Sequence, residues 1–118
     1  MRILIADDDQ GFRVFIRRLL ESEKDWTIIG EAIDGVEAVS KADKLRPHLV
    51  LMDMDLPGID GLEATRQIKT IAPGTVVIMF SSVDGPAYRE AAARCGANQF
   101  LFKLDPLSKI ITTIRGSS

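Results

Sequence analysis

The chain has 118 residues, of which 46% are hydrophobic and 27% are charged, and its net charge is -2. This length suits a single domain over residues 1–118 that buries roughly two thirds of its unfolded surface, and no apolar run approaches the ~18 residues of a membrane span. The first residues do not look like a signal peptide and the scattered Lys and Arg form no phosphate-binding stripe, so we expect a cytoplasmic domain without membrane or nucleic-acid partners.

Five short apolar runs, rich in Ile, Val, Leu and Phe, predict buried parallel strands. In chain order they cover residues 3–6, 27–30, 49–52, 76–80 and 100–102. Between them, apolar residues recur at helical spacing. Three stretches follow this spacing clearly and two follow it less cleanly: 12–20, 88–95 and 107–114, then 36–45 and 62–72.

Helix-start signals support the two weaker helices. Each begins with a capping carboxylate three residues before a Glu: Asp34 with Glu37, and Asp60 with Glu63. The last helix is expected to begin at Asp105-Pro106, with Asp105 as its N-cap and Pro106 as its first residue, and to end at Gly116.

Strict alternation of strand and helix predicts an α/β fold. Repeated five times, it indicates an open, doubly wound, five-stranded parallel sheet with right-handed crossovers and helices on both faces. In such sheets the ligand site lies beyond the carboxyl ends of the strands, so the residues that follow each strand are the candidates for chemistry. The second strand runs into Glu31 and Asp34, which suits an edge strand outside the site.

Polar side chains directly follow the other four strands. They are Asp7, Asp8, Asp9, Asp53, Ser81, Ser82 and Lys103. Carboxylates from two neighbouring strand ends would repel one another, and a hard cation would relieve the conflict. Oxygen ligands without nearby His or Cys favour Mg²⁺ or Mn²⁺, while a lysine and a hydroxyl could complete a pocket for a phosphoryl group. No glycine-rich phosphate loop follows the first strand, which argues against a nucleotide.

Each of these residues also has a purely structural interpretation when taken alone. Aspartates cap helices, Ser81 could satisfy a loop amide, and Lys103 could be solvated surface. Their conjunction at four strand ends favours a functional site.

The single cysteine and the single histidine are not expected to take part in chemistry. Cys95 suits a small apolar contact near a helix end. His48 has no second histidine or cysteine nearby to help hold a metal, and it is expected to be a partly exposed residue before a strand.

The chain resembles a response-regulator receiver domain, the phosphoacceptor half of two-component signalling, over essentially its whole length. The resemblance is carried by Ile5-Ala6-Asp7-Asp8, by Asp53-Met54-Asp55-Leu56-Pro57-Gly58-Ile59-Asp60-Gly61, by Phe80-Ser81-Ser82, and by Gly96-Ala97 leading to Phe100-Leu101-Phe102-Lys103. Residues 28–35 are similar to receivers whose output is a helix-turn-helix DNA-binding domain. The resemblance implies a flavodoxin-like (βα)5 fold with strand order 2-1-3-4-5.

The resemblance also implies a phosphoacceptor and a metal site. Asp53 would be phosphorylated by a sensor histidine kinase, through in-line attack on phosphohistidine. Asp8 and Asp53 would bind Mg²⁺ (or Mn²⁺) directly, together with the backbone carbonyl of Asp55. Asp7 would act mainly through a metal-bound water.

A conformational switch is the third implication of the resemblance. Ser81 would hydrogen-bond a phosphoryl oxygen, Lys103 would neutralise another, and movement of Ser81 would draw Phe100 inward. The surface that changes is built from residues 88–95, 100–102 and 107–114, and it could also form a homodimer. The domain would then be a regulator and not an enzyme: it promotes its own Mg²⁺-dependent phosphorylation and dephosphorylation and controls an output domain or partner protein.

The loop after the last strand departs from the family pattern. Many receivers follow the lysine with a proline in a cis peptide, whereas Leu104 follows Lys103 here. Phe100 occupies a position where tyrosine is also common. A third acid, Asp9, is interpreted as exposed or as the N-cap of the first helix, because an acid pair shifted to residues 8–9 would lose the family match at residues 12–13.

Two other functions remain open. Asp53-Met54-Asp55 resembles the Asp-x-Asp of haloacid-dehalogenase-like phosphatases, in which the second Asp is acid and base. That family carries the motif after its first strand and usually needs a longer chain with a lid. The second alternative is a phosphorylation-independent adaptor that keeps the receiver fold as a docking surface.

Overall fold

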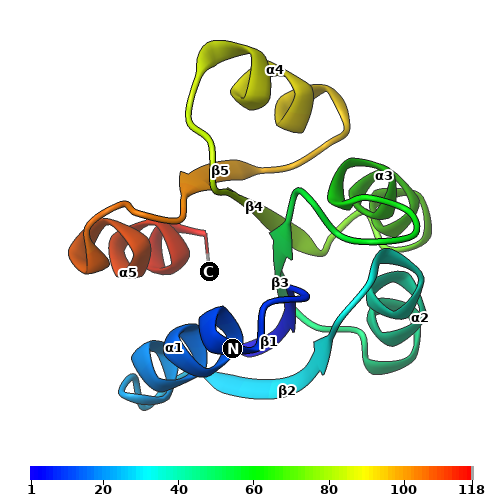
Figure 1. Ribbon diagram of the computed structural model, residues 1–118. Helices are drawn as coiled ribbons and strands as arrows, with labels where there is room; N and C mark the ends of the chain where they lie inside the picture. Colours follow the sequence, from blue (N-terminus) through cyan, green and yellow to red (C-terminus); the bar gives the residue numbers. More distant parts are fainter. Residues whose placement is uncertain (118) are drawn as a thin grey trace.

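The computed structural model describes residues 1–117, which form five strands alternating with five helices (Figure 1). The strands are β1 (Arg2–Ala6), β2 (Thr27–Ala32), β3 (Leu49–Asp53), β4 (Val76–Ser81) and β5 (Gln99–Phe102). The helices are α1 (Gln10–Glu21), α2 (Gly35–Leu45), α3 (Gly61–Ile71), α4 (Pro86–Arg94) and α5 (Leu107–Gly116). All neighbouring strands are parallel and their order is β2-β1-β3-β4-β5, which confirms the predicted fold and strand order.

Two hydrophobic layers hold helices on opposite faces of the sheet. In β3, Leu49 and Leu51 face the layer that contains the buried residues of α1 and α5, whereas Val50 and Met52 face the layer shared with α2, α3 and α4. Because successive side chains of a strand point to opposite faces, a strand buried on both sides must be apolar throughout. This requirement explains the continuous apolar runs, and each fully buried Leu or Ile stabilises the fold by about 1.5–3 kcal/mol.

Carboxylate caps begin the first three helices. Asp34 accepts a hydrogen bond from the Glu37 amide at 2.7 Å, and Asp60 accepts one from the Glu63 amide at 2.9 Å, so both predicted caps are confirmed. Asp9 caps α1 by accepting from the Gly11 amide at 2.9 Å. These caps satisfy backbone donors that the first turn of a helix leaves unpaired.

The prediction for the start of the last helix was wrong. Pro106 has an extended ψ of 145° and is itself the N-cap, so α5 begins at Leu107. The Asp105 carboxylate instead accepts from the Phe102 amide at 3.0 Å, inside the tight turn that follows β5. The helix also runs through Gly116, and its C-cap is Ser117.

The outer flanks of the predicted apolar stripes remain exposed. Phe15 in α1, Tyr88 in α4 and Leu107 in α5 are each more than 40% exposed, and Leu104 in the turn after β5 is 80% exposed. Every peptide bond among residues 1–117 is trans, including the one before Leu104. In the same residues, no helix combines the length and the apolar character that crossing a membrane requires.

Candidate functional site

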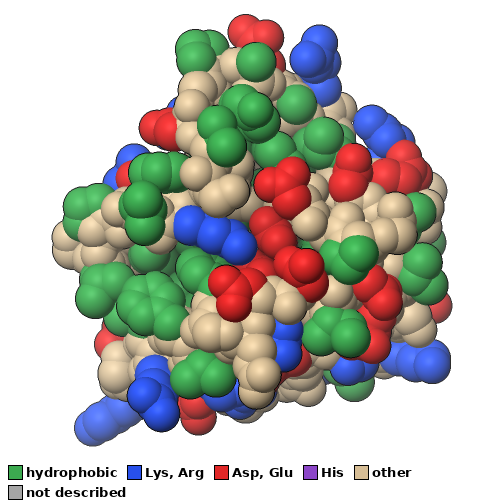
Figure 2. Space-filling view, viewed as in Figure 1, with side chains coloured by type: hydrophobic (Ala, Val, Ile, Leu, Met, Phe, Trp, Pro, Cys, Tyr) green, Lys and Arg blue, Asp and Glu red, His purple; other side chains and the backbone are tan. Residues whose placement is uncertain are grey.

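The predicted site residues converge at the carboxyl end of the sheet. Asp7 directly follows β1, Asp53 and Ser81 are the last residues of β3 and β4, and Lys103 directly follows β5. These four strands are adjacent in the sheet, so their ends meet at one edge. Figure 2 shows acidic side chains gathered at the centre of this face with a basic side chain beside them.

Three aspartates form a compact cluster here. Asp7, Asp8 and Asp53 each contribute one carboxylate oxygen to a group in which all three oxygens lie within 4.8 Å of one another. Asp7 and Asp53 are 1% and 5% exposed, while Asp8 is exposed. Burial, together with the charge of Asp7, raises the pKa of Asp53 to about 6, although the Lys103 ammonium acts in the opposite direction.

Lys103 is the cation that faces this cluster. Its Nζ lies 2.7 Å from Oδ2 of Asp7 and 3.6 Å from Oδ1 of Asp53. Burial opposes its charge, but the hydrogen bond with Asp7 and the charges of Asp53 and Asp7 outweigh burial and raise the pKa of Lys103. The ammonium also lies over the ring of Phe12, 4.4 Å from its centroid, and the Lys103 amide donates to the carbonyl of Ser81 at 2.8 Å.

Ser81, whose carbonyl accepts from the Lys103 amide, is buried. Ser81 is 0% exposed, and its Oγ accepts a hydrogen bond from the Val83 amide at 3.0 Å. That bond leaves the hydroxyl proton available as a donor. Ser81 can therefore contribute one directed hydrogen bond at the edge where Asp53 lies.

Phe100, the predicted switch residue, is the second residue of β5. It is half-buried in β5 and packs against the core layer that includes Ala92 and Cys95. The guanidinium of Arg89, from α4, lies 4.9 Å from the centroid of the Phe100 ring. Arg89 also pairs with Asp84 at 2.9 Å, so α4 and the loop before it are joined through one side chain to β5.

The loop after Asp53 is held by backbone contacts. The Asp55 amide donates to Oδ1 of Asp53 at 3.3 Å, and the Asp55 side chain points to solvent. Gly61 lies so close to this loop that a Cβ added to it would be 2.0 Å from the carbonyl oxygen of Asp53. Gly61 also donates to the carbonyl of Met54 at 2.9 Å. The first residue of α3 therefore fixes the backbone that presents Asp53, a role that the sequence analysis missed.

Two residues of α1 also reach the site. Phe12 supports the ammonium of Lys103, and Arg13 donates from Nη1 to the backbone carbonyl of Asp7 at 2.7 Å. In the sequence both residues only helped to fix the register of the acid pair. Their contacts depend on how α1 crosses the sheet, and no local motif announces them.

The donor set of the acidic cluster fits a hard cation. Three carboxylates converge, two of them beside the Lys103 ammonium, and the repulsion between Asp53 and Asp7 is large enough to act on the pKa of Asp53. Oxygen ligands with no His or Cys among them are those that Mg²⁺ and Mn²⁺ prefer. Asp7, Asp8 and Asp53 are the residues that would hold such an ion.

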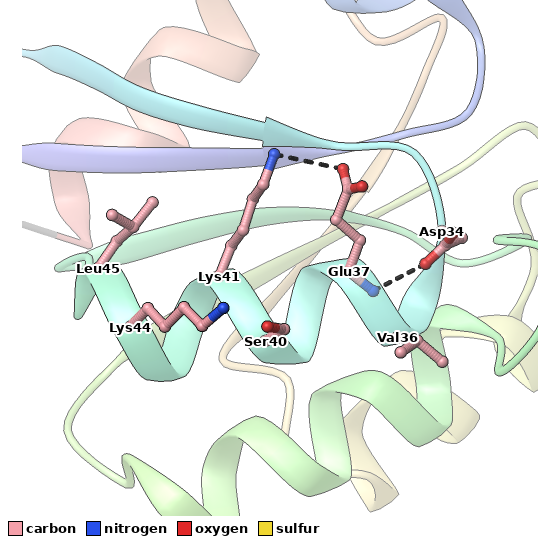
Figure 3. Close-up of a pocket in the computed structure, with 7 residues that line it drawn as sticks. All are labelled: Asp34, Val36, Glu37, Ser40, Lys41, Lys44 and Leu45. Carbon is pink, nitrogen blue, oxygen red and sulfur yellow. Dashed lines mark hydrogen bonds and ion pairs between the residues drawn. The ribbon is translucent and has the colours of Figure 1, made fainter.

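A separate groove of about 570 Å³ runs along α2 (Figure 3). Lys41 is one of its lining residues and pairs with Glu37 at 3.3 Å, as the dashed line in Figure 3 marks. The groove shares no residue with the acidic cluster. Its lining consists of Asp34, Val36, Glu37, Ser40, Lys41, Lys44 and Leu45.

Comparisons with known proteins agree with this geometry. A family model described as the response regulator receiver domain matches residues 3–115. The chain is 43% identical over 104 residues to protein-glutamate methylesterase/protein-glutamine glutaminase 4 of Myxococcus xanthus, covering 87% of this chain and 30% of that protein. It is 34% identical over 120 residues to the response regulator protein VraR of Staphylococcus aureus, covering 100% of this chain and 56% of that protein.

Solved structures show the same relationship. The response regulator domain of Thermotoga maritima CheB superposes with a TM-score of 0.91 at 32% identity, covering 99% of this chain and 95% of that one. A LuxR-family two-component response regulator from Aurantimonas sp. SI85-9A1 superposes with a TM-score of 0.93 at 30% identity, covering 98% and 82% of the two chains.

Fold and site together define a flavodoxin-like domain with an acidic edge whose residues fit a hard cation. The chain belongs to the response regulator receiver domain family, which serves two-component signal transduction. Phosphorylation on an aspartate and the use of Mg²⁺ are general features of this family. The chain spans about a third to a half of the length of the curated relatives named above, which carry more than a receiver.

Proposed function

We propose that this domain, over residues 1–118, is a phosphorylation switch whose phosphoacceptor is Asp53. The observation that carries the proposal is the convergence of Asp7, Asp8 and Asp53 within 4.8 Å at the strand ends, with Lys103 facing them. One nearly buried carboxylate thus lies beside both a cation-binding pair and a fixed ammonium. This is the arrangement that phosphoryl transfer to an aspartate needs, because its catalysis is mainly positioning and charge neutralisation.

Asp53 would accept the phosphoryl group by in-line attack. One of its Oδ atoms forms a bond to phosphorus as the bond between phosphorus and the histidine nitrogen of a sensor kinase breaks. The pKa of about 6 keeps most of the Asp53 carboxylate ionised, and so nucleophilic, at neutral pH. Lys103, whose Nζ lies 3.6 Å from Oδ1 of Asp53, would neutralise one phosphoryl oxygen, and the buried Ser81 would donate to another.

Magnesium would be held by Asp8 and Asp53 with the backbone carbonyl of Asp55, and by Asp7 through water. When bound, Mg²⁺ or Mn²⁺ supplies positive charge that offsets the carboxylates and the transferring group. Asp7 and Asp8 are the residues of this chain that bring the ion to the phosphoacceptor.

The readout would be the surface of α4, β5 and α5. Movement of Ser81 toward the phosphoryl group opens space near β5 that Phe100 can fill, and Arg89 would lose its position over that ring. The reshaped surface would control an output domain or a partner protein, and it could support a homodimer. Such a change is a population shift, and its size depends on the difference in phosphate contacts between two states.

We propose a regulatory rather than an enzymatic role for these residues, in the cytoplasm. The first relative named above is a methylesterase and glutaminase and the second is a response regulator, so receivers similar to this one serve different outputs. The similarity of residues 28–35 to regulators with a helix-turn-helix output supports a DNA-binding output. A phosphatase of the haloacid-dehalogenase type is disfavoured because Asp53 ends the third strand and Asp55 is exposed.

Acetyl phosphate tests the proposal without the kinase. The protein incubated with acetyl phosphate and Mg²⁺ should gain the mass of one phosphoryl group, and EDTA should prevent the gain. Asp53→Asn should abolish it, whereas Asp55→Asn, two residues away with an exposed side chain, should retain it. Modification that persists in Asp53→Asn would assign the phosphoryl group to another residue, and an unmodified wild type would favour a phosphorylation-independent adaptor.

A further inference from the structure

Arg13 links the edge strand β2 to the loop that carries the acid pair. Its Nη1 donates to the backbone carbonyl of Asp7 at 2.7 Å, and its Nε donates to Oε1 of Glu31 at 2.9 Å. The Arg13 side chain is 15% exposed, so these bonds are partly shielded from water. A planar guanidinium that bonds two groups at once is held in one orientation, and it holds its partners in turn.

The contact with Arg13 completes the restraint of Asp7. The Asp7 amide donates to the carbonyl of Ala32 at 2.9 Å, its Oδ1 accepts from the Asp9 amide at 2.8 Å, and its Oδ2 lies 2.7 Å from Lys103. The remaining polar group, the carbonyl, is the one that Arg13 holds. All four polar groups of Asp7 therefore have partners.

The Asp7 carbonyl matters most for the next residue. It belongs to the peptide that joins Asp7 to Asp8, and the plane of that peptide sets the direction in which the Asp8 side chain leaves the backbone. Asp8 is exposed, so packing does little to orient it. The bond from Arg13 thus acts on the direction of a carboxylate that must converge with Asp7 and Asp53 to bind a cation.

We propose that Arg13 is a positioning residue for the divalent cation, which it never touches. By fixing the peptide between Asp7 and Asp8, it keeps the Asp8 carboxylate in the cluster. The inference rests on the metal site of the proposed function. Outer-shell groups that orient metal ligands change metal affinity about 10–100-fold when they are removed.

Arg17 provides a matched control on the same helix. Its Nε donates to Oε2 of Glu31 at 2.9 Å, and its Nη2 lies 2.7 Å from the same oxygen, so it shares the Glu31 partner of Arg13. The structure gives Arg17 no bond to Asp7. Arg17 and Arg13 therefore differ in the contact that the proposal invokes.

The sign of the effect separates positioning from simple electrostatics. Arg13 is a cation near a cation site, so removing its charge reduces repulsion and by itself would strengthen Mg²⁺ binding. Loss of positioning has the opposite effect. Weaker binding in a variant that has lost a positive charge therefore cannot come from charge alone.

The experiment is a calorimetric titration of MgCl₂ into Arg13→Met, Arg17→Met and wild-type protein without phosphodonor. Methionine keeps an apolar stem of similar length and removes the guanidinium. Arg13→Met should bind Mg²⁺ at least about ten-fold more weakly than the wild type, while Arg17→Met should stay within about two-fold or bind slightly tighter. Thermal melts should show that each variant unfolds cooperatively.

Equal affinity in Arg13→Met and wild type would overturn the proposal, and so would an equal loss in Arg17→Met. If Arg13→Met does not fold, Arg13→Lys decides: its single ammonium cannot reproduce both bonds, so its Mg²⁺ affinity should fall at least about three-fold, and wild-type affinity would refute positioning. The Mg²⁺ titration gives its result whether or not the protein can be phosphorylated. A wild type that binds Mg²⁺ but takes no phosphoryl group would refute the phosphoacceptor and leave the role of Arg13 intact.

Discussion

Replacing Asp53 with Asn should stabilise the protein, and the gain should depend on pH. Asparagine has nearly the same shape and its Oδ1 can still accept the hydrogen bond that the Asp55 amide donates. What it removes is a carboxylate that is 5% exposed and repelled by Asp7. In protein freed of divalent cations by EDTA, the wild-type charge at this position is a cost to folding.

The magnitude follows from the pKa of Asp53. Its value of about 6 in the folded protein lies above the ordinary 3.8, so the folded chain holds this proton more tightly than the unfolded chain does. Wild-type stability therefore falls, relative to Asp53→Asn, as the pH rises from about 4 to about 6, and the difference stays constant above that range. At roughly 1.4 kcal/mol per pH unit, the gap between 3.8 and about 6 gives a gain of about 3 kcal/mol at neutral pH.

Urea unfolding at pH 4 and pH 7.5 measures this gain. Titrations shared by wild type and variant cancel in the difference between their free energies of unfolding, so the difference isolates Asp53. Asp25→Asn, an exposed site in the turn before β2, is the control and should change stability by less than about 0.5 kcal/mol at both pH values. A gain that is the same at both pH values would refute the electrostatic reasoning, as would no gain at pH 7.5.

Three further predictions concern the same edge of the sheet. Gly61→Ala should lower the free energy of unfolding in urea by more than about 2 kcal/mol, because its Cβ would lie 2.0 Å from the Asp53 carbonyl oxygen, whereas Gly74→Ala, whose Cβ meets nothing within 4 Å, should be nearly neutral. Phe12→Leu should cost about 1–2 kcal/mol in the same assay, since it removes the ring beneath Lys103; a loss below 0.3 kcal/mol would contradict this contact. Added Mg²⁺ should raise the melting temperature of the wild type and leave that of Asp53→Asn nearly unchanged, and an equal rise in both would place the ion elsewhere.

The strand ends could be predicted from the sequence because they depend on local pattern. An apolar run that stops at a charged residue marks both the end of a buried strand and the start of the loop beyond it, which is how Asp7, Asp53 and Lys103 were found together. Parallel pairing then brings these residues to one edge, whatever the details of the helices. The caps Asp34 and Asp60 were predictable for the same reason, since their partners lie three residues away.

The features that were missed depend on tertiary contacts or on competition for one side chain. Asp105 has the sequence of an N-cap, yet its carboxylate accepts from the Phe102 amide in the turn and pairs with the Lys109 side chain of α5 at 3.4 Å, so it does not cap the helix backbone. The contacts of Arg13 could have been predicted only with the knowledge that Glu31 lies beside α1. Glycine is required at position 61 because the start of α3 passes close to the backbone of Asp53. In the sequence, the pair Asp60-Gly61 indicated only the helix cap and not this close approach.

The charge balance of the site couples the phosphoacceptor to the loop after β5. With Asp53 unmodified, Lys103 lies nearer to Asp7, at 2.7 Å, than to Asp53, at 3.6 Å. A phosphoryl group on Asp53 would add about one further negative charge beside it, and the ammonium would then be drawn toward the new oxygens. The Lys103 amide is bonded to the Ser81 carbonyl at 2.8 Å, so the backbones that carry the two groups proposed to contact the phosphoryl oxygens are joined directly where β4 and β5 end. The ammonium can turn on its flexible stem without breaking that bond, so the redistribution of charge would begin in the Lys103 side chain while the two strand ends stay joined.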